Sequence, residues 1–156
     1  IDREFGRAYA KAQRGAGMDL PIRGTVLVSL RDEDKASGAG ALRVLQEEGF
    51  SLVATAGTAA YMRERGLDVQ PIHKVREGAP HTESLISSGE VSLVIATTRM
   101  GDASAVRDSA SMRRAALEAG IPYFTTVAGA RAAASAIRAL RAGEVQPIAL
   151  QDLHTV

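Results

Sequence analysis

Hydroxyl and glycine residues gather where apolar segments of this chain give way to helical ones. The clearest case is residues 53–61, where Thr55, Gly57 and Thr58 follow an apolar run and precede a helical pattern. Threonine hydroxyls and an unobstructed glycine amide at a helix N-terminus can hold a phosphate, because that helix end carries partial positive charge. A single threonine in this position more often serves as a helix cap. The phosphate interpretation therefore needs support from neighbouring segments.

The segments that carry these residues alternate between strand and helix patterns. Strands that alternate with helices form a parallel sheet covered on both faces. We predict one α/β domain with five parallel strands, a helix within residues 1–17 before it and an alanine-rich helix over about residues 129–142 after the last strand. A short extended piece is expected around residues 145–150. The apolar runs of strand length are residues 24–30, 50–55, 68–72, 91–98 and 122–126.

The ends of these strands are expected to form one binding edge, because ligands of open parallel sheets bind outside the carboxyl ends of the strands. Only three lysines occur among the 19 basic residues, and two of them, Lys35 and Lys74, lie just beyond strands. Compact cations beside hydroxyls and a glycine amide predict a phosphate site. The residues expected at this edge are Ser29 and Lys35, then Thr55, Gly57 and Thr58, then His73 and Lys74, then Thr97 and Thr98, and finally Thr125 and Thr126.

Carboxylates near the same edge could support acid–base catalysis. Asp32 and Asp34 belong to a charge run that is typical of a solvated helix start, whereas Asp102 and Asp108 lie in or after the loop that follows the fourth strand. Proton transfer needs a positioned partner, and none accompanies these carboxylates in the sequence. Helix capping or ligand contact is therefore favoured over catalysis for Asp102 and Asp108.

The three histidines do not suggest a metal site. His73, His81 and His154 lack the spacing of metal ligands, and cysteine is absent from the chain. His81 lies in a loop with glycine and proline, so we expect it to brace that loop by hydrogen bonds. The sequence predicts no catalytic residue and no metal ligand.

Composition narrows the class of protein further. A chain of 156 residues can bury one sizeable core. Its 19 basic and 18 acidic side chains nearly cancel, so bulk charge favours neither a nucleic-acid nor a membrane-surface partner. The lack of cysteine favours a reducing compartment, and no apolar run approaches the ~20 residues of a membrane span. We expect a cytoplasmic protein.

Seven motifs follow one another along almost the entire chain, in the order FGRAYAKAQ, SLRDEDK, GFSLVATAGTAAYMRERG, HKVREGAPH, VIATT, RRAALEAGIPYFTT and AGARAA. Together they resemble the C-terminal regulatory region of the large subunit of carbamoyl-phosphate synthase. The resemblance implies the methylglyoxal synthase-like fold, a three-layer α/β/α arrangement with strand order 3-2-1-4-5. It also implies that residues 1–21 are the tail of a preceding ATP-grasp synthetase domain with a linker, and that residues 22–156 are the methylglyoxal synthase-like allosteric domain.

The resemblance also implies a function. In this family the domain catalyses no reaction and has no cofactor of its own, while ATP and Mg serve the parent enzyme, a ligase. The domain binds UMP or IMP and so tunes carbamoyl phosphate synthesis for pyrimidine and arginine biosynthesis, beside the synthetase domains and the glutaminase small subunit. By matching motifs, Lys35, Thr55, Thr58 and Lys74 resemble the phosphate and ribose contacts, Ser29, Thr97, Thr98, Asp108 and Ser109 surround the rest of the nucleotide, and Gly57 completes the predicted phosphate site.

Two departures from the family pattern affect the choice of effector. Ala96 stands where nucleotide-binding members carry an asparagine, so a side chain that could hydrogen-bond the base or ribose is lost. Ornithine, an activator in some members, lies against a Tyr-Asp-Thr stretch, and this chain carries Tyr123, Phe124 and Thr125 instead. A phenylalanine offers no partner for the ornithine amine, so we predict weak or absent ornithine control.

Two other functions are alternatives to nucleotide sensing. A methylglyoxal synthase would share the fold and the phosphate site, and Asp102 stands roughly where the catalytic aspartate of that enzyme lies. The first strand ends without the His-Asp pair of the enzyme, and the glutamines after its aspartate are missing, so this alternative ranks lower. The other alternative is a structural or oligomerisation module that self-associates and has lost effector binding.

Overall fold

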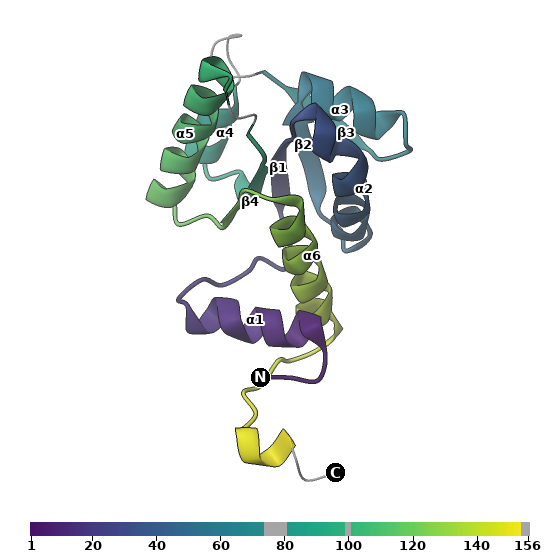
Figure 1. Ribbon diagram of the computed structural model, residues 1–156, viewed down its shortest axis with the longest axis vertical. Coiled ribbons are helices and arrows are strands. Elements are labelled where there is room, and N and C mark those ends of the chain that lie inside the picture. The colour runs from purple at the N-terminus through teal and green to yellow at the C-terminus, as the bar shows by residue number, and fades with distance from the viewer. Residues whose placement is uncertain (74–80, 99–100, 154–156) are drawn as a thin grey trace.

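A parallel sheet lies between two sets of helices in the computed structural model of the chain, which describes residues 1–73, 81–98 and 101–153 (Figure 1). All four neighbouring strand pairs are parallel, and the strand order is β3-β2-β1-β4-β5. The predicted α/β class, the five parallel strands and the strand order implied by the resemblance are confirmed. The strands are β1 (Thr25–Ser29), β2 (Ser51–Thr55), β3 (Val69–Ile72), β4 (Val91–Ala96) and β5 (Tyr123–Phe124).

Helices cover both faces of the sheet. One face packs against α2, α3 and α6, and the other against α4 and α5. No helix in residues 1–73, 81–98 and 101–153 is long and apolar enough to cross a membrane. The helices are α1 (Phe5–Gly15), α2 (Asp32–Glu47), α3 (Ala56–Arg63), α4 (Thr82–Ser87), α5 (Ala103–Glu118) and α6 (Val127–Ala142), followed by a 3-10 turn at Leu150–Leu153.

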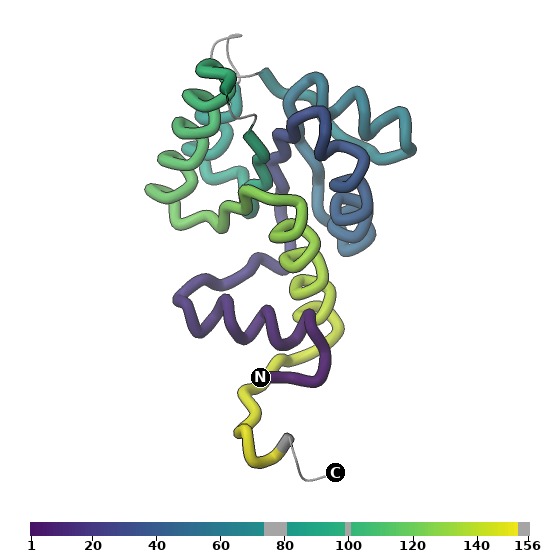
Figure 2. Tube along the Cα trace, in the orientation of Figure 1, coloured from purple at the N-terminus to yellow at the C-terminus, as the bar shows by residue number. Residues whose placement is uncertain are grey.

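Two predicted elements near the C-terminus differ from the structure. The last strand ends at Phe124 instead of continuing through residues 125–126, because Thr126 begins α6 and its hydroxyl accepts a hydrogen bond from the Gly129 N–H at 3.0 Å. The piece around residues 145–150 is not a strand. After α6 the chain has left the sheet, so no strand edge is beside it, and it runs as a tail into the 3-10 turn (Figure 2).

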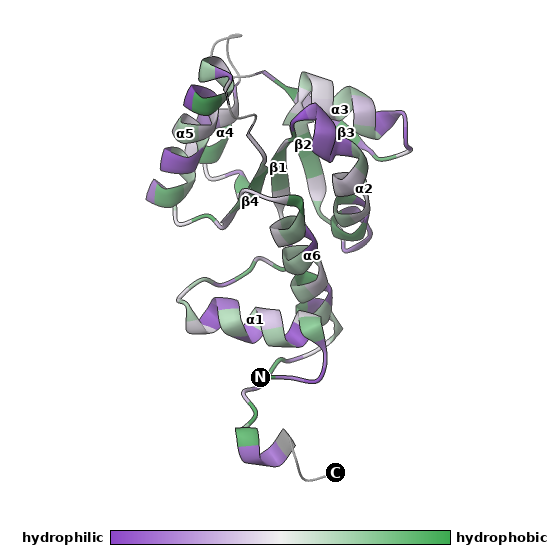
Figure 3. Cartoon of the chain, in the orientation of Figure 1, coloured by the Kyte–Doolittle hydropathy of each residue, from purple (hydrophilic) through white to green (hydrophobic). Residues whose placement is uncertain are grey.

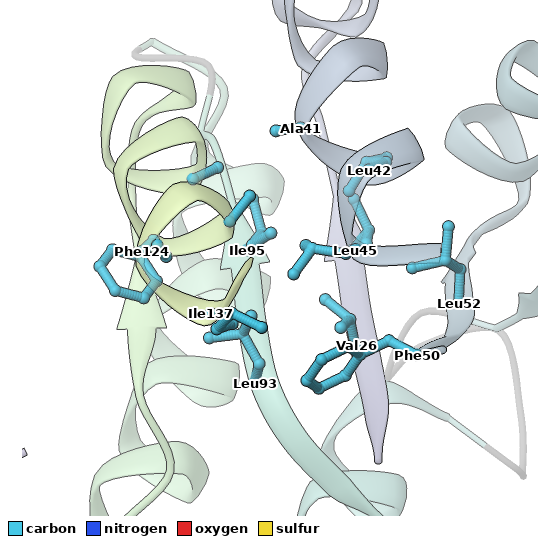
Figure 4. Close-up of a cluster of buried hydrophobic side chains, with 14 of the residues drawn as sticks. Val26, Ala41, Leu42, Leu45, Phe50, Leu52, Leu93, Ile95, Phe124 and Ile137 are labelled. Carbon is cyan, nitrogen blue, oxygen red and sulfur yellow. The ribbon is translucent and has the colours of Figure 1, made fainter. Parts of the chain in front are cut away.

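The central strand β1 is buried on both faces. Val26 and Val28 pack in a core with α2 and α6, where Leu45 is also fully buried (Figure 4). Leu27 points to the other face and packs in a second core with Ile86 of α4. Two-sided burial requires an apolar run without polar alternation, as strands of parallel sheets generally show. Figure 3 shows this as hydrophobic colour along the inner strands.

Helix α1 crosses α6 below the sheet (Figure 1). At the crossing, Gly6 leaves no room for a side chain. A Cβ atom at Gly6 would lie 2.6 Å from the backbone oxygen of Ser135. The start of α1 is held by Asp2, whose carboxylate pairs with Lys11 at 2.8 Å and Arg7 at 3.2 Å. The Lys11 ammonium, helped by Arg7, holds the pKa of Asp2 well below its ordinary range. The N-terminal helix therefore packs closely on α6, and the division of the chain after residue 21 stays a prediction.

The crossing of α1 and α6 predicts different effects for two glycines of α1. Gly6→Ala should lower the free energy of unfolding by about 1 to 3 kcal/mol, because its methyl group would collide with backbone. Gly15→Ala is the matched control, since a Cβ there meets nothing within 4 Å, and it should change stability by less than about 1 kcal/mol. Urea unfolding followed by circular dichroism measures both values. Equal stabilities of the two variants would contradict the close crossing.

Candidate functional site

A cavity of about 270 Å³ opens beyond the carboxyl ends of β1 and β4. The strand order reverses here, because β2 lies on one side of β1 and β4 on the other. The helices that follow these two strands, α2 and α5, leave toward opposite faces of the sheet. Such a reversal leaves a crevice between the outgoing segments, which is where ligands bind in open α/β sheets.

The structure brings most of the predicted effector residues together around this cavity. Tyr123 and Thr125, the ornithine-type positions, are not among the lining residues, and Lys74 lies outside the described residues. The predicted residues that line the cavity are Ser29, Lys35, Thr55, Gly57, Thr58, Thr97, Thr98, Asp108 and Ser109.

The Thr58 hydroxyl joins α3 to the end of β1. It accepts a hydrogen bond from the Leu30 N–H at 3.0 Å and donates one to the Leu30 carbonyl oxygen at 3.3 Å. The Thr55 hydroxyl donates to it at 3.3 Å. One hydroxyl has one donor and two acceptor positions, so the capacity of Thr58 Oγ is fully used inside the protein. The sequence predicts a ligand-facing hydroxyl at Thr58, whereas in the structure this group holds two elements together.

The N-terminus of α3 faces the cavity without a side-chain cap. Thr55 occupies the N-cap position, but its hydroxyl caps no backbone amide of the helix. The first amides of a helix have no partner within it. The Lys35 ammonium group lies beside them, since Nζ is 3.4 Å from where a Cβ of Gly57 would be. The Lys35 side chain is only 12% exposed, and its ammonium group pairs with Asp32 Oδ1 at 2.5 Å.

A second set of polar contacts joins β1, α2 and β4. The Arg31 N–H donates to Thr97 Oγ1 at 3.1 Å, and the Arg31 guanidinium group pairs with both carboxylate oxygens of Asp34, the closer at 2.6 Å. This guanidinium group lowers the pKa of Asp34, and a hydrogen bond with the Thr97 side chain lowers it further. Asp34 thus differs from the solvated position expected at a helix start, because its side chain is only 18% exposed.

Helix α5 forms the opposite wall of the cavity. Asp102 caps it, since Asp102 Oδ1 accepts hydrogen bonds from the Ser104 N–H at 2.9 Å and the Ala105 N–H at 3.1 Å, and the predicted capping role is confirmed. Asp108 lies half-buried on the cavity side. This wall therefore carries two carboxylates.

Hydroxyl groups connect the same wall to β4 and β5. Thr98 Oγ1 donates to Ser109 Oγ at 2.6 Å, and the Tyr123 hydroxyl lies 3.4 Å from the same Ser109 oxygen. Tyr123 is thus directed toward α5, with the Arg113 guanidinium carbon 5.7 Å from its ring centre. Thr125 is exposed.

Sequence reasoning missed several residues of the cavity wall. Ala105 and Met112 line it together with Asp108 and Ser109. The spacing i, i+3, i+4 and i+7 marks one face of a helix, so extending this pattern from Asp108 and Ser109 could have found both. Thr82 also lines the cavity and is 1% exposed. It is the first residue of α4, and no sequence signal pointed to it.

The remaining histidine predictions have two outcomes. His81 caps α4, since its Nδ1 accepts a hydrogen bond from the Ser84 N–H and its own N–H donates to Ser84 Oγ. That His81 braces the segment before it stays a prediction, because residues 74–80 lie outside the described residues. His154 lies outside the described residues. In residues 1–73, 81–98 and 101–153, no three His, Asp or Glu side chains are grouped so that they could hold a metal ion.

Known sequences match this chain along nearly its whole length. A family model for the MGS-like domain matches residues 39–125. The carbamoyl phosphate synthase large chain of Rhizobium meliloti is 50% identical over 150 residues, which are 95% of this chain and 13% of that protein. The carbamoyl phosphate synthase large chain, C-terminal section, of Methanopyrus kandleri is 44% identical over 99% of this chain and 28% of its own length. The chain therefore spans a small part of these relatives.

A solved structure supports the fold independently. Methylglyoxal synthase from Elizabethkingia anophelis superposes with a TM-score of 0.55, over 71% of this chain and 76% of that one. Sequence identity between the two is 18%. At this identity the likeness concerns the fold alone.

The Asp34 ion pair predicts a pH-dependent stability. Because the folded-state pKa of Asp34 is lowered from its ordinary 3.8, the carboxylate stabilises the fold above that pH, and the contribution is lost as the pH falls through the lowered folded-state value. Asp34→Asn should therefore be less stable than the parent at about pH 7, with a difference that shrinks below about pH 4.

The control for this prediction is Asp19→Asn. Asp19 is 85% exposed in its ion pair with Arg14, and such pairs contribute at most about 1 kcal/mol. Chemical unfolding of the parent and both variants across this pH range measures the differences. A stability gap for Asp34→Asn that stayed constant with pH would rule out the ionised pair as its cause.

Proposed function

This chain belongs to the MGS-like domain family, and we propose that it is the nucleotide-sensing regulatory domain of a carbamoyl phosphate synthase large chain. Its ligand is a nucleoside monophosphate of the UMP or IMP type, bound in the cavity at the strand ends. The 50% identity to the Rhizobium meliloti protein over 95% of this chain supports the parent assignment. The cavity chemistry supports the ligand.

The observation that carries the proposal is the Lys35 ammonium group over the open N-terminus of α3. The group is largely buried, and Gly57 leaves the helix amides unobstructed. A phosphate in this position would receive hydrogen bonds from the ammonium group and the amides, and the helix dipole would favour its charge. The donors are Lys35 and backbone N–H groups, because the Thr55 and Thr58 hydroxyls already donate within the protein.

The two sides of the cavity differ in their charged groups, which suits a nucleotide. Both cations, Lys35 and Arg31, lie near β1 and β2, each paired with a carboxylate of α2, whereas the α5 side carries the carboxylates of Asp102 and Asp108 without a lysine or arginine among the lining residues. Carboxylates accept hydrogen bonds from ribose hydroxyls and base N–H groups. A ligand with a phosphate at one end and hydrogen-bond donors at the other meets both requirements. Lys74, the other cation of the predicted set, belongs to the same proposal by resemblance.

The identity of the base depends on the wall around Ala96. Ala96 is 1% exposed and lines the cavity beside Thr97. A methyl group offers no hydrogen bond, so the base is read by the remaining polar groups and by fit. Ornithine control is weak or absent in this proposal. Phe124 is buried in the core, where its ring approaches Gly129, and it supplies no carboxylate for an amine (Figure 4).

Regulation belongs to the parent enzyme in this proposal. The domain itself carries out no reaction, and nucleotide binding alters the balance between two states of the cytoplasmic synthetase, which includes neighbouring synthetase domains and a glutaminase small subunit. ATP and Mg act at the catalytic domains. A lyase reaction through Asp102 is disfavoured because Asp102 Oδ1 already accepts two backbone N–H groups as a helix cap.

Isothermal titration with UMP and IMP tests the proposal. The parent chain should bind at least one nucleotide saturably, and Lys35→Gln should bind it at least about tenfold more weakly because a charged hydrogen-bond donor is lost. Arg14→Gln removes the same charge from α1, outside the cavity lining, and should match the parent. A folded parent that binds neither nucleotide would favour the structural alternative. Equal affinities for the parent and Lys35→Gln would contradict the placement of the phosphate beside Lys35.

A further inference from the structure

The Lys35 ammonium group already has an anionic partner, the carboxylate of Asp32. We infer that Asp32 is a built-in competitor of the ligand. Its carboxylate occupies the position beside the Lys35 ammonium group where the ligand phosphate would bind, and it thereby lowers the affinity of the site for the ligand. The inference rests on the proposed function, because it concerns the same cavity and the same ligand phosphate. It assigns to Asp32 a role in setting affinity instead of a contact that holds the ligand.

The Asp32 carboxylate, and not the Lys35 ammonium group, is the partner that moves when a phosphate binds, because Asp32 is the more exposed of the two. The Lys35 side chain is 12% exposed, whereas that of Asp32 is 83% exposed, although Nζ and Oδ1 are only 2.5 Å apart. The cation is thus enclosed by the protein beside Gly57, and the carboxylate reaches it from the solvent side. Both residues line the cavity. A phosphate that approaches Lys35 from the cavity must share the ammonium group with Asp32 or displace the carboxylate.

Sharing the ammonium group carries an electrostatic cost. A phosphate in contact with Lys35 Nζ would lie roughly 5 Å from the Asp32 carboxylate, and like charges at this separation near a protein surface repel each other appreciably. Because the Asp32 side chain is 83% exposed, a dielectric close to that of water applies, and the repulsion corresponds to about a five- to tenfold loss of affinity. Salt reduces it only in part, because 5 Å is shorter than the screening length of about 8 Å at physiological ionic strength.

When a phosphate displaces the Asp32 carboxylate from Lys35, the carboxylate remains at the N-terminus of α2. Asp32 is the first residue of α2, and Glu33 and Asp34 complete an acidic first turn. Negative side chains in the first turn of a helix are stabilised by the helix dipole. Asp32 can therefore turn from Lys35 into solvent without losing that stabilisation. The ion pair closes when the ligand leaves and opens when it binds.

The test compares two neutralised carboxylates in the same helical turn. Asp32→Asn removes the competitor, while Glu33→Gln removes the same charge from an exposed neighbour that does not line the cavity. Isothermal titration with UMP, and separately with inorganic phosphate, should give about five- to tenfold tighter binding for Asp32→Asn than for the parent. Glu33→Gln should stay within about twofold, because its charge is farther from the ligand.

Each other outcome has a defined meaning. Unchanged binding by Asp32→Asn would overturn the inference, and weaker binding would overturn it by showing that Asp32 positions Lys35 for the ligand. Equal gains for Asp32→Asn and Glu33→Gln would assign the effect to net charge and would also overturn it. If inorganic phosphate binds more tightly to Asp32→Asn than to the parent but UMP and IMP bind to neither, the role of Asp32 as a competitor is supported and the nucleotide proposal fails. If Asp32→Asn binds no phosphate, the inference fails.

Discussion

Burial of β1 on both faces is the constraint on which the rest of this structure depends. Its residues contribute to two separate cores, one with α2 and α6 and one with α4 and α5. Strands β2 and β4 pair with the two edges of β1, and the helices after β1 and β4 leave toward opposite faces. The cavity lies where the strand order reverses, between the segments that leave β1 and β4.

The Thr58 and Thr97 hydroxyls at the cavity edge bond to backbone groups of the protein. Thr58 joins α3 to the backbone of Leu30, and Thr97 accepts the N–H group of Arg31. These bonds satisfy backbone groups where the strand ladder stops, which is a place where unpaired polar groups would be costly. The ligand chemistry is then left to charges, and to amides that no side chain caps.

The far end of the molecule shows that packing also joins the N-terminal helix to this domain. Helix α6 begins at the sheet edge with the Thr126 cap and continues past the sheet to α1 (Figure 1). At their crossing, Gly6 lies against the Ser135 backbone without room for a side chain. A single helix, α6, thus connects the edge that carries the cavity with the N-terminal helix α1.

The sequence by itself determined the α/β class, the five strands and most residues of the cavity wall. Apolar runs of strand length and strand-end hydroxyls are local patterns, and parallel strands bring their carboxyl ends to one edge by geometry alone. The strand predicted from the sequence extends two residues beyond the observed end of β5. A threonine can end a strand or cap a helix, and the hydrogen bond from the Gly129 N–H to Thr126 shows that this threonine caps α6.

Only the tertiary structure decided how the site residues are used. In the folded chain the Thr58 hydroxyl bonds to Leu30, and the first amides of α3 have no side-chain cap. Lys35 lies beside Gly57, and Thr82 belongs to the cavity wall. Each of these facts depends on contacts between residues far apart in the chain. Hydrogen-bond capacity and exposure are properties of packed neighbours, and a list of residue types does not contain them.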